Sequence, residues 1–168
     1  MTHATASDRP PPGPAREILC HLADPEAATA FGRCLGLCLQ PGDTVLLEGP
    51  IGAGKTHLAR AAIRALLGDD GFEVPSPTYT LVQIYDGPAA AIWHADLYRL
   101  SGPAEVEELG LHEAMGADIV MIEWPDRLGE AHPETALTLT LSLAGGGRDL
   151  RITGPDAFLA RLASRGCA

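Results

Sequence analysis

The residues best placed to do chemistry lie in one short glycine-rich stretch, GPIGAGKT, at positions 49–56. This stretch matches the pattern G-x-x-x-x-G-K-[ST] of a phosphate-binding loop. Small residues let successive backbone N–H groups point inward as a nest for anions, while Lys55 would bridge the β- and γ-phosphates and the hydroxyl of Thr56 would bind Mg²⁺. The residues expected to hold a nucleoside triphosphate are Gly49, Gly52, Ala53, Gly54, Lys55 and Thr56.

Lys55 also stands out in the composition of the whole chain. It is the only lysine, whereas all the other basic residues are arginine. A compact ammonium group can reach between phosphate oxygens at a place where a planar guanidinium fits badly. The lone lysine therefore favours a phosphate cradle over a flexible strand-to-helix turn that binds no ligand.

A nucleoside triphosphatase also needs an acid at the end of a buried strand, to hold the metal directly or through water. Glu123 follows the apolar run DIVMI, and Asp96 ends the run AAIWHA. In open α/β sheets, ligands bind at the carboxyl ends of the strands. We therefore expect Glu123 at the metal and Asp96 at a metal-bound water or at the attacking water. The alternative for each acid is a solvated residue at the edge of the sheet.

Four other residues each allow a functional and a purely structural interpretation. Trp124 would either cover the nucleotide or pack against the core. Ser76 and Thr78, in a stretch stiffened by prolines, form either a switch loop that senses the γ-phosphate or a stiff surface loop. His94, two residues before Asp96, is expected to be a strand histidine with satisfied hydrogen bonds rather than a catalytic base.

The glycine loop lies between two elements that must position it. The run TVLLE at 44–48 is typical of a central strand that is buried on both faces. The run at 57–68 predicts an amphipathic helix that begins at the loop and ends at Gly68. A short strand at 16–23 and a helix that begins near Asp24 are expected before these elements.

The rest of the sequence predicts further strands with short helices. Hairpins are expected at 79–97 and 135–154, a buried strand at 117–124, helical turns at 102–116 and a last amphipathic helix at 155–166. Together these elements indicate an α/β fold of the P-loop NTPase type. Its central sheet should be mostly parallel, with added antiparallel strands and flanking helices.

The length and composition favour a single domain. A chain of 168 residues, of which 46% are hydrophobic, can bury one good core but not two. Residues 1–14 are rich in proline and small polar residues and are expected to form a disordered tail. Residues 15–165 are expected to form one P-loop ATPase domain.

The charge and hydropathy of the chain exclude several classes of function. A formal net charge of -10 argues against direct binding of a nucleic acid backbone, which calls for a basic face. No apolar stretch approaches the roughly 20 residues that span a bilayer, and the first residues lack the features of a secretory signal. We therefore expect a cytosolic protein with no membrane contact, in which a partner would hold any RNA.

The four cysteines are expected to be reduced. Cys20, Cys34, Cys38 and Cys167 include no CxxC pair. Their spacing supplies too few ligands for a zinc site, and disulfides are rare in the cytosol.

Several segments together resemble the TsaE family, bacterial ATPases of the machinery that makes threonylcarbamoyladenosine in tRNA. The resemblance covers the chain from about Glu17 to Leu143, and it rests on the order and spacing of EGPIGAGKTHLAR, VPSPTYTLVQIY, HADLYRL, EELGLHE and IVMIEWPDRL. It implies a small subunit that binds ATP and Mg²⁺ and works with the threonylcarbamoyl transferase subunit and its paralogous scaffold subunit. The tRNA would be contacted only through these partners, and ATP hydrolysis would reset the complex between catalytic cycles.

The resemblance also implies roles for individual residues. Asp96 matches an acid that the family needs for activity, and Trp124 matches a tryptophan beside the nucleotide. Thr29, in the first helix, fits loosely where the family approaches the adenine. The chain departs from the family pattern at Pro50 and Ile51, where an acidic residue and leucine are common, which affects the fine geometry of the loop more than the assignment. The implied catalytic residues are Asp96, Lys55 and Glu123, and the implied metal ligands are Thr56 and Glu123.

Two other functions fit a phosphate-binding loop on a chain of this size. One is a small-molecule kinase, although such kinases use arginines in a lid, and the late Arg148 and Arg151 fall in an expected hairpin. The other is a nucleotide-sensing scaffold with negligible turnover, in which ATP only stabilises an assembly.

Overall fold

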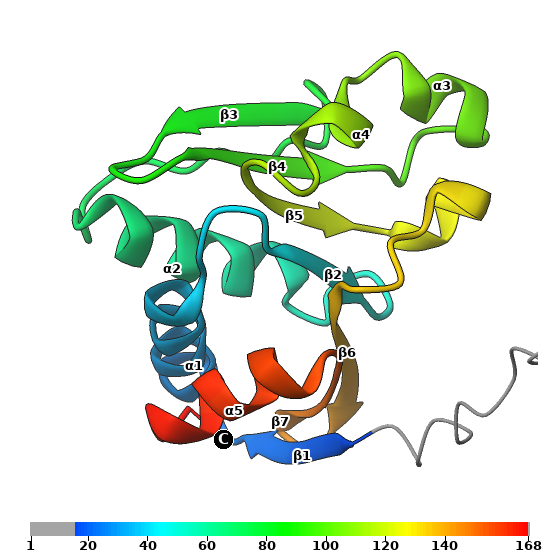
Figure 1. Ribbon diagram of the computed structural model, residues 1–168. Coiled ribbons are helices and arrows are strands. Elements are labelled where there is room, and N and C mark those ends of the chain that lie inside the picture. The colour runs from blue at the N-terminus through cyan, green and yellow to red at the C-terminus, as the bar shows by residue number, and fades with distance from the viewer. Residues whose placement is uncertain (1–15, 168) are drawn as a thin grey trace, which may run out of the picture.

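Runs of aliphatic and β-branched residues form the middle strands of a seven-stranded sheet in the computed structural model, which describes residues 16–167 (Figure 1). The order of the strands across the sheet is β1-β7-β6-β2-β5-β4-β3. β2 pairs in parallel with β5 and β6, and β4 pairs in parallel with β5, whereas the outer pairs β1–β7, β6–β7 and β3–β4 are antiparallel. The strands are β1 (Glu17–Leu22), β2 (Thr44–Glu48), β3 (Val82–Asp86), β4 (Ala91–Asp96), β5 (Ile119–Glu123), β6 (Leu137–Ala144) and β7 (Gly147–Thr153). The expected parallel centre with added antiparallel strands is confirmed.

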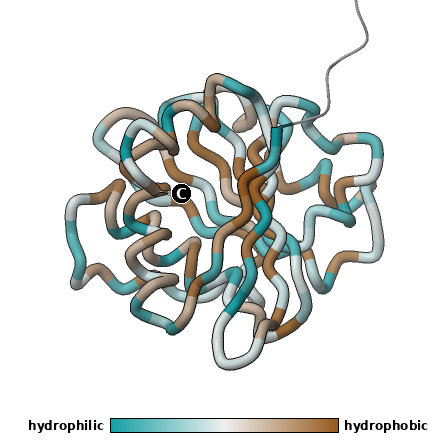
Figure 2. The backbone as a smooth tube through the Cα atoms, turned by 90° about the horizontal axis from the view of Figure 1, so that it is seen from below, coloured by the Kyte–Doolittle hydropathy of each residue, from teal (hydrophilic) through white to brown (hydrophobic). Residues whose placement is uncertain are grey.

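Helices cover both faces of the sheet, because neighbouring residues of the central strands point to opposite faces. In β2, Val45 and Leu47 belong to one buried cluster and Leu46 to another. The first cluster includes residues of α1, α2 and α5, and the second includes residues of α3, α4 and η1. Figure 2 shows the hydrophobic segments toward the middle of the molecule and hydrophilic loops around it. The helices are α1 (Pro25–Cys38), α2 (Lys55–Leu67), α3 (Pro103–Glu107), α4 (Leu111–Ala114), the 3₁₀ helix η1 (Pro125–Ala131) and α5 (Asp156–Ser164).

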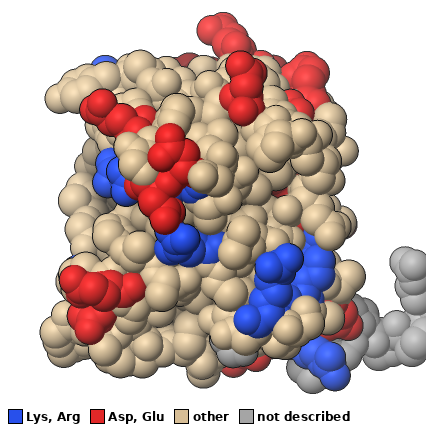
Figure 3. All heavy atoms as spheres, turned by 90° about the vertical axis from the view of Figure 1, so that its left-hand side faces the viewer, with Lys and Arg blue, Asp and Glu red and all other residues tan. Residues whose placement is uncertain are grey.

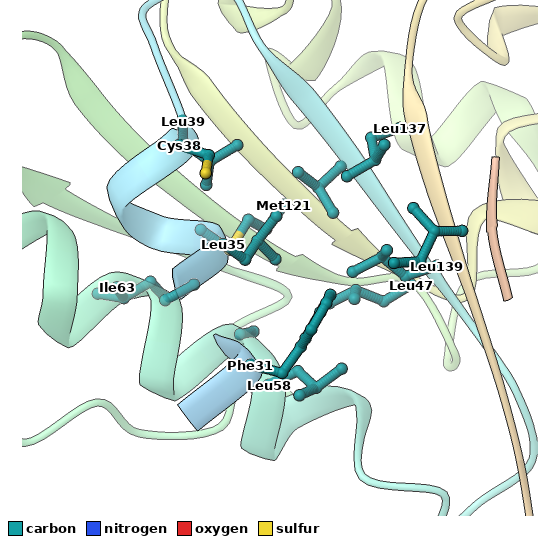
Figure 4. Close-up of a cluster of buried hydrophobic side chains, with 14 of the residues drawn as sticks. Phe31, Leu35, Cys38, Leu39, Leu47, Leu58, Ile63, Met121, Leu137 and Leu139 are labelled. Carbon is teal, nitrogen blue, oxygen red and sulfur yellow. The ribbon is translucent and has the colours of Figure 1, made fainter. Parts of the chain in front are cut away.

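The helix α1 begins where the sequence indicates and packs closely against α2. The side chain of Asp24 accepts a hydrogen bond from the backbone N–H of Ala27 at 2.7 Å, which caps the helix. A Cβ atom on Gly36 would lie 2.3 Å from the carbonyl oxygen of Ala62, so only glycine permits this approach of the two helices. In Figure 4, side chains of both helices meet those of the strands in one cluster. This packing fixes α2, and with it the glycine loop, against the sheet.

One strand begins later than its sequence suggests. The strand expected from Tyr79 begins at Val82, because the chain first forms a turn. The backbone N–H of Leu81 donates to the carbonyl of Pro77 at 2.7 Å, and Leu81 has a φ of 66°. A left-handed leucine cannot continue a strand, so the ladder starts one residue later.

The prediction of reduced cysteines is wrong for two of the four. Cys34 and Cys167 form a disulfide, although 133 residues separate them in the sequence. The helix α5 packs beside α1 and carries the end of the chain to the turn of α1 that holds Cys34 and Cys38. Spacing within the sequence could not reveal this tertiary contact. Cys20 and Cys38 have free thiols, and burial raises the pKa of Cys38 while Arg165 and Arg161 oppose that shift.

Two expectations concern the ends of the chain and membranes. The tail predicted at 1–14 lies outside the described residues. Among residues 16–167, no helix has the length and the apolar composition that crossing a membrane would require.

Candidate functional site

The glycine loop runs from the end of β2 to the start of α2, and its backbone depends on glycine. Gly52 and Gly54 have φ angles of 79° and 104°, in the left-handed region that residues with a Cβ atom rarely adopt. The loop leads directly into Lys55, the first residue of α2. The free N–H groups and the partial positive charge of a helix N-terminus favour an anion at this position.

The ammonium group of Lys55 already lies within the loop. Only 5% of the residue is exposed, and Nζ donates hydrogen bonds to the carbonyl oxygens of Gly49 at 2.7 Å and Pro50 at 3.0 Å. Nζ also lies 4.0 Å from the ring centroid of Trp124. Burial lowers the pKa of Lys55, and the nearby charges of Glu123 and Asp96 oppose that shift. Lys55 is therefore held in position by partners that phosphate oxygens could replace.

Glu123 lies at the carboxyl end of β5 with both oxygens hydrogen-bonded. The hydroxyl of Thr56 donates to Oε1 and Oε2 at 2.9 Å and 2.8 Å. Nε2 of His94 donates to Oε1 at 2.8 Å. Glu123 is 2% exposed and His94 is fully buried, so water does not compete for these bonds. The carboxylate is fixed beside the hydroxyl that follows the loop lysine.

Asp96 occupies the matching position on the neighbouring strand. It is the register partner of Glu123 in the parallel pair β4–β5. Its Oδ1 accepts a hydrogen bond from the backbone N–H of Tyr98 at 3.0 Å, and its Oδ2 accepts a longer one from Thr78 at 3.3 Å. The hydroxyls of Ser76 and Thr78 lie 2.8 Å apart. The proline-stiffened loop is therefore connected to the second acid of the site.

These residues surround an open cleft of about 400 Å³ in front of the glycine loop. A second hollow, of about 210 Å³, lies on the other side of the loop against the β6–β7 hairpin. Gly54 and His57 line both hollows, so the loop and the first turn of α2 separate them. The cleft is lined by Ile51, Gly52, Gly54, Lys55, Thr56, His57, Thr78, Asp96, Tyr98, Glu123 and Trp124.

The structure brings together most of the residues that the sequence singled out. Trp124 lines the cleft and packs its ring against Tyr98, with ring centroids 4.8 Å apart. Its φ of 60° is unusual for tryptophan and turns the chain sharply out of β5. Gly49 contributes its carbonyl to Lys55, and Ala53 lines the second hollow. Thr29 lines neither of these hollows and instead bonds to Nε2 of His57 at 2.8 Å.

Two residues at the site were not recognised as site residues from the sequence. His94 lies in a strand, as expected, but among residues 16–167 only its Nε2 is hydrogen-bonded, and the partner is Glu123 itself. Its Nδ1 has no hydrogen-bond partner in the part of the chain that the structure describes. Its position two residues before Asp96, on the same face of the strand, was the only available signal. Arg148 contacts the glycine loop from the β6–β7 hairpin, and nothing in the local sequence indicated this.

Comparisons with known proteins point to one family. The family model described as "Threonylcarbamoyl adenosine biosynthesis protein TsaE" matches residues 22–150. A tRNA threonylcarbamoyladenosine biosynthesis protein TsaE of Rickettsia typhi is 39% identical over 140 residues, which cover 83% of this chain and 96% of the relative. The protein of the same name from Bacillus subtilis is 30% identical over 133 residues, which cover 77% of this chain and 80% of the relative.

A solved structure has the same architecture. The crystal structure of Bacillus subtilis YdiB superposes with a TM-score of 0.73 and covers 92% of this chain and 97% of its own. The sequence identity in that superposition is 22%, so the likeness shows a shared fold.

Proposed function

Because the chain belongs to the TsaE family of tRNA threonylcarbamoyladenosine biosynthesis proteins, we propose that it is the Mg²⁺-dependent ATPase subunit of that modification machinery. One observation carries the proposal. The hydroxyl of Thr56 and the carboxylate of Glu123 meet in the cleft directly beside the buried ammonium of Lys55. A hydroxyl, a carboxylate and an ammonium at the end of a glycine loop are the groups that a Mg²⁺–triphosphate complex requires.

The residues present fit a magnesium ion. Mg²⁺ prefers oxygen ligands in octahedral geometry at about 2.0–2.1 Å, so that two neighbouring ligand oxygens lie about 2.9 Å apart. The hydroxyl of Thr56 lies 2.8 and 2.9 Å from the two oxygens of Glu123, so these residues already have that spacing. When bound, the ion would neutralise charge on the β- and γ-phosphates. Thr56 and Glu123 would hold it, and His94 would keep the carboxylate in place.

The remaining residues would bind and orient the substrate. Lys55 would exchange the carbonyls of Gly49 and Pro50 for phosphate oxygens. These oxygens are negatively charged and therefore form stronger hydrogen bonds with the ammonium group than neutral carbonyls do. Both oxygens of Asp96 face donors of its own chain, which suits an acid that acts through water rather than one that binds the metal directly. The second hollow, with its mixed polar and apolar lining, would take the nucleoside.

The charge of the chain supports a role in which partners hold the tRNA. The formal net charge is -10, and on the face that Figure 3 shows, acidic side chains are interspersed with the basic ones. A surface that binds a nucleic acid backbone directly would instead gather positive charge. We propose that the threonylcarbamoyl transferase subunit and its paralogous scaffold subunit bind the tRNA, and that this chain supplies ATP hydrolysis to their cycle in the cytoplasm.

Phosphate release from ATP tests the proposal. The assay uses the purified chain with Mg²⁺, first alone and then with the transferase pair and tRNA. We expect slow release by the chain alone, faster release with the partners, and loss of ATP binding in Lys55→Ala. Unchanged ATP affinity in Lys55→Ala would contradict the phosphate cradle. Transfer of phosphate to a small metabolite, with no effect of the partners, would identify a kinase instead.

A reconstituted modification complex that contains the Asp96→Asn variant tests whether ATP hydrolysis is needed for tRNA modification. If this variant binds ATP without hydrolysing it, and the reconstituted complex still completes repeated cycles, ATP serves only as a scaffold ligand. We expect the complex to stop after its first cycles.

A further inference from the structure

A side chain from the far end of the sequence, Arg148, holds the glycine loop from the side of the second hollow. Arg148 lies near the start of β7, 95 residues beyond the loop. Its Nε donates to the carbonyl oxygen of Ala53 at 3.0 Å, and one terminal nitrogen donates to that of Gly52 at 3.1 Å. The other terminal nitrogen donates to the carbonyl of Gly147 at 2.8 Å, which fixes the guanidinium on its own strand. Two consecutive peptide groups of the loop are thus bound to one rigid fork.

Holding these carbonyls also sets the direction of the N–H groups that follow them. A trans peptide group is planar, so its C=O and N–H point in opposite directions. The bond from Arg148 to the carbonyl of Ala53 therefore turns the N–H of Gly54 away from the guanidinium. The peptide before it is held at both ends, because the N–H of Ala53 donates to the carbonyl of Pro50 at 3.1 Å.

The loop needs such a hold because its glycines allow many other conformations. Glycine loses more conformational freedom than any other residue when it is ordered, and a Cβ atom on Gly52 or Gly54 would meet nothing within 4 Å. Packing alone therefore does not fix these two residues. Lys55 also holds the loop, through Gly49 and Pro50, but phosphate oxygens compete for those same donors. The hydrogen bonds of Arg148 lie on the side of the loop that faces the second hollow, away from the cleft that holds Lys55 and Thr56, so phosphate oxygens in that cleft do not compete for them.

We propose that Arg148 is a positioning residue that presets the phosphate-binding loop through the carbonyls of Gly52 and Ala53. A loop that is ordered before binding does not lose that entropy when the nucleotide arrives, so its affinity is higher. The inference rests on the proposed function, since it assigns Arg148 to a loop that binds the phosphates of ATP. The β6–β7 hairpin is thereby part of the nucleotide site.

Three variants separate this role from a general effect of charge. Arg148→Gln removes the fork, and Arg148→Lys keeps the charge but can reach the two carbonyls only with a single ammonium. Arg151→Gln is the matched control, because it makes the same change of residue and of net charge three positions along the same strand, where the side chain is exposed. Circular dichroism and the thermal midpoint verify that each variant is folded.

The first measurement is hydrogen–deuterium exchange of the loop in the nucleotide-free protein. We expect the amides of residues 52–54 to exchange faster in Arg148→Gln than in the wild type, and to be unchanged in Arg151→Gln. The second is calorimetric titration with ATP and Mg²⁺. The affinity for ATP should fall by about tenfold in Arg148→Gln, which corresponds to about one net hydrogen bond to a charged group. The affinity of Arg148→Lys should lie closer to that of Arg148→Gln than to that of the wild type.

The outcomes distinguish this inference from the proposed function. If the wild type does not bind ATP, the proposed function fails, and faster exchange in Arg148→Gln still supports the hold on the loop. If the wild type binds ATP while loop exchange in Arg148→Gln equals that in Arg151→Gln, the inference is wrong. Full recovery of affinity in Arg148→Lys would also overturn it, because the charge alone would then be sufficient.

Discussion

Replacing Thr56 by valine should separate the two tasks of its hydroxyl. Valine has nearly the same shape and a similar helix propensity, so the change removes little besides the hydroxyl. In the nucleotide-free protein, Glu123 would lose its bonds from Thr56 and keep only that from His94. With nucleotide present, the metal would lose one of its two protein ligands. We therefore expect lower stability and a loss of the benefit that Mg²⁺ gives to nucleotide binding.

The size of the stability effect follows from the burial of the carboxylate. Glu123 is 2% exposed, so little of its carboxylate is open to water that could replace the lost donor. A hydrogen bond to a charged group contributes about 1.5–3 kcal/mol. For a domain of this size, each kcal/mol shifts the thermal midpoint by about 2–4 °C, so the midpoint should fall by about 3–12 °C. The assay is thermal unfolding without ligand, with ATP and EDTA, and with ATP and Mg²⁺.

Thr140→Val provides a matched control, because it removes the same kind of hydrogen bond away from the glycine loop. The hydroxyl of Thr140 donates to Oε2 of Glu48 at 2.8 Å, which is again a threonine bound to a glutamate. Thr140 lines a different hollow, on the β1–β7–β6 part of the sheet. This control should lose some stability and keep the extra stabilisation by Mg²⁺ over ATP alone. If Thr56→Val also keeps that extra stabilisation, the metal assignment of Thr56 is refuted.

Three further predictions concern the second acid, the buried ammonium and the disulfide. Asp96→Asn should keep ATP bound but slow phosphate release by at least about a hundredfold, as expected for loss of a group that positions or activates water; unchanged release in a turnover assay would remove Asp96 from the mechanism. Burial lowers the pKa of Lys55 in the folded chain below its ordinary 10.5. Between the folded-state pKa and 10.5, the unfolded chain therefore binds more protons than the folded one. Denaturant unfolding should therefore show the wild type gaining stability relative to Lys55→Met as the pH rises toward 10.5, and a constant difference would exclude the shift. Reducing the disulfide should lower the unfolding free energy by up to about 5 kcal/mol, because it releases a loop of 133 residues; Cys34→Ser should match the reduced wild type in thermal unfolding, Cys20→Ser should not, and equal midpoints with and without reductant would contradict the cross-link.

The parts of the fold that depend on local pattern could be predicted from the sequence. The apolar run at 44–48 indicated a central strand, and β2 has parallel neighbours on both sides. The glycines between the last two strands indicated the β6–β7 hairpin, which is antiparallel as expected. The start of β3 was misplaced because no local pattern announces the left-handed φ of Leu81. The disulfide was missed because α5 returns to α1 only through tertiary packing.

In the candidate site too, local sequence patterns predicted some residues, whereas others come together only through tertiary packing. Gly52 to Thr56 are adjacent in the sequence, so their motif could be recognised directly. Asp96 and Glu123 were placed together by a general property of parallel sheets, and they are register partners. The contact between Arg148 and the loop depends on the pairing of β7 with β6, which brings a residue from 95 positions away to the loop. A pattern of residue types along the chain carries no information about that contact.

Under the proposed function, the internal partners of Lys55 and Thr56 would decide how ATP binds. Both side chains are hydrogen-bonded to groups of the chain itself, Lys55 to loop carbonyls and Thr56 to Glu123. Binding of ATP and Mg²⁺ would therefore exchange these internal hydrogen bonds for bonds to phosphate and metal, and only the difference between the two sets would contribute to affinity. The site is ordered in advance, which favours rapid and specific binding, while the exchange limits how tightly the product can be retained. The ATPase subunit that we propose would release ADP in each cycle of its partners and would benefit from both properties.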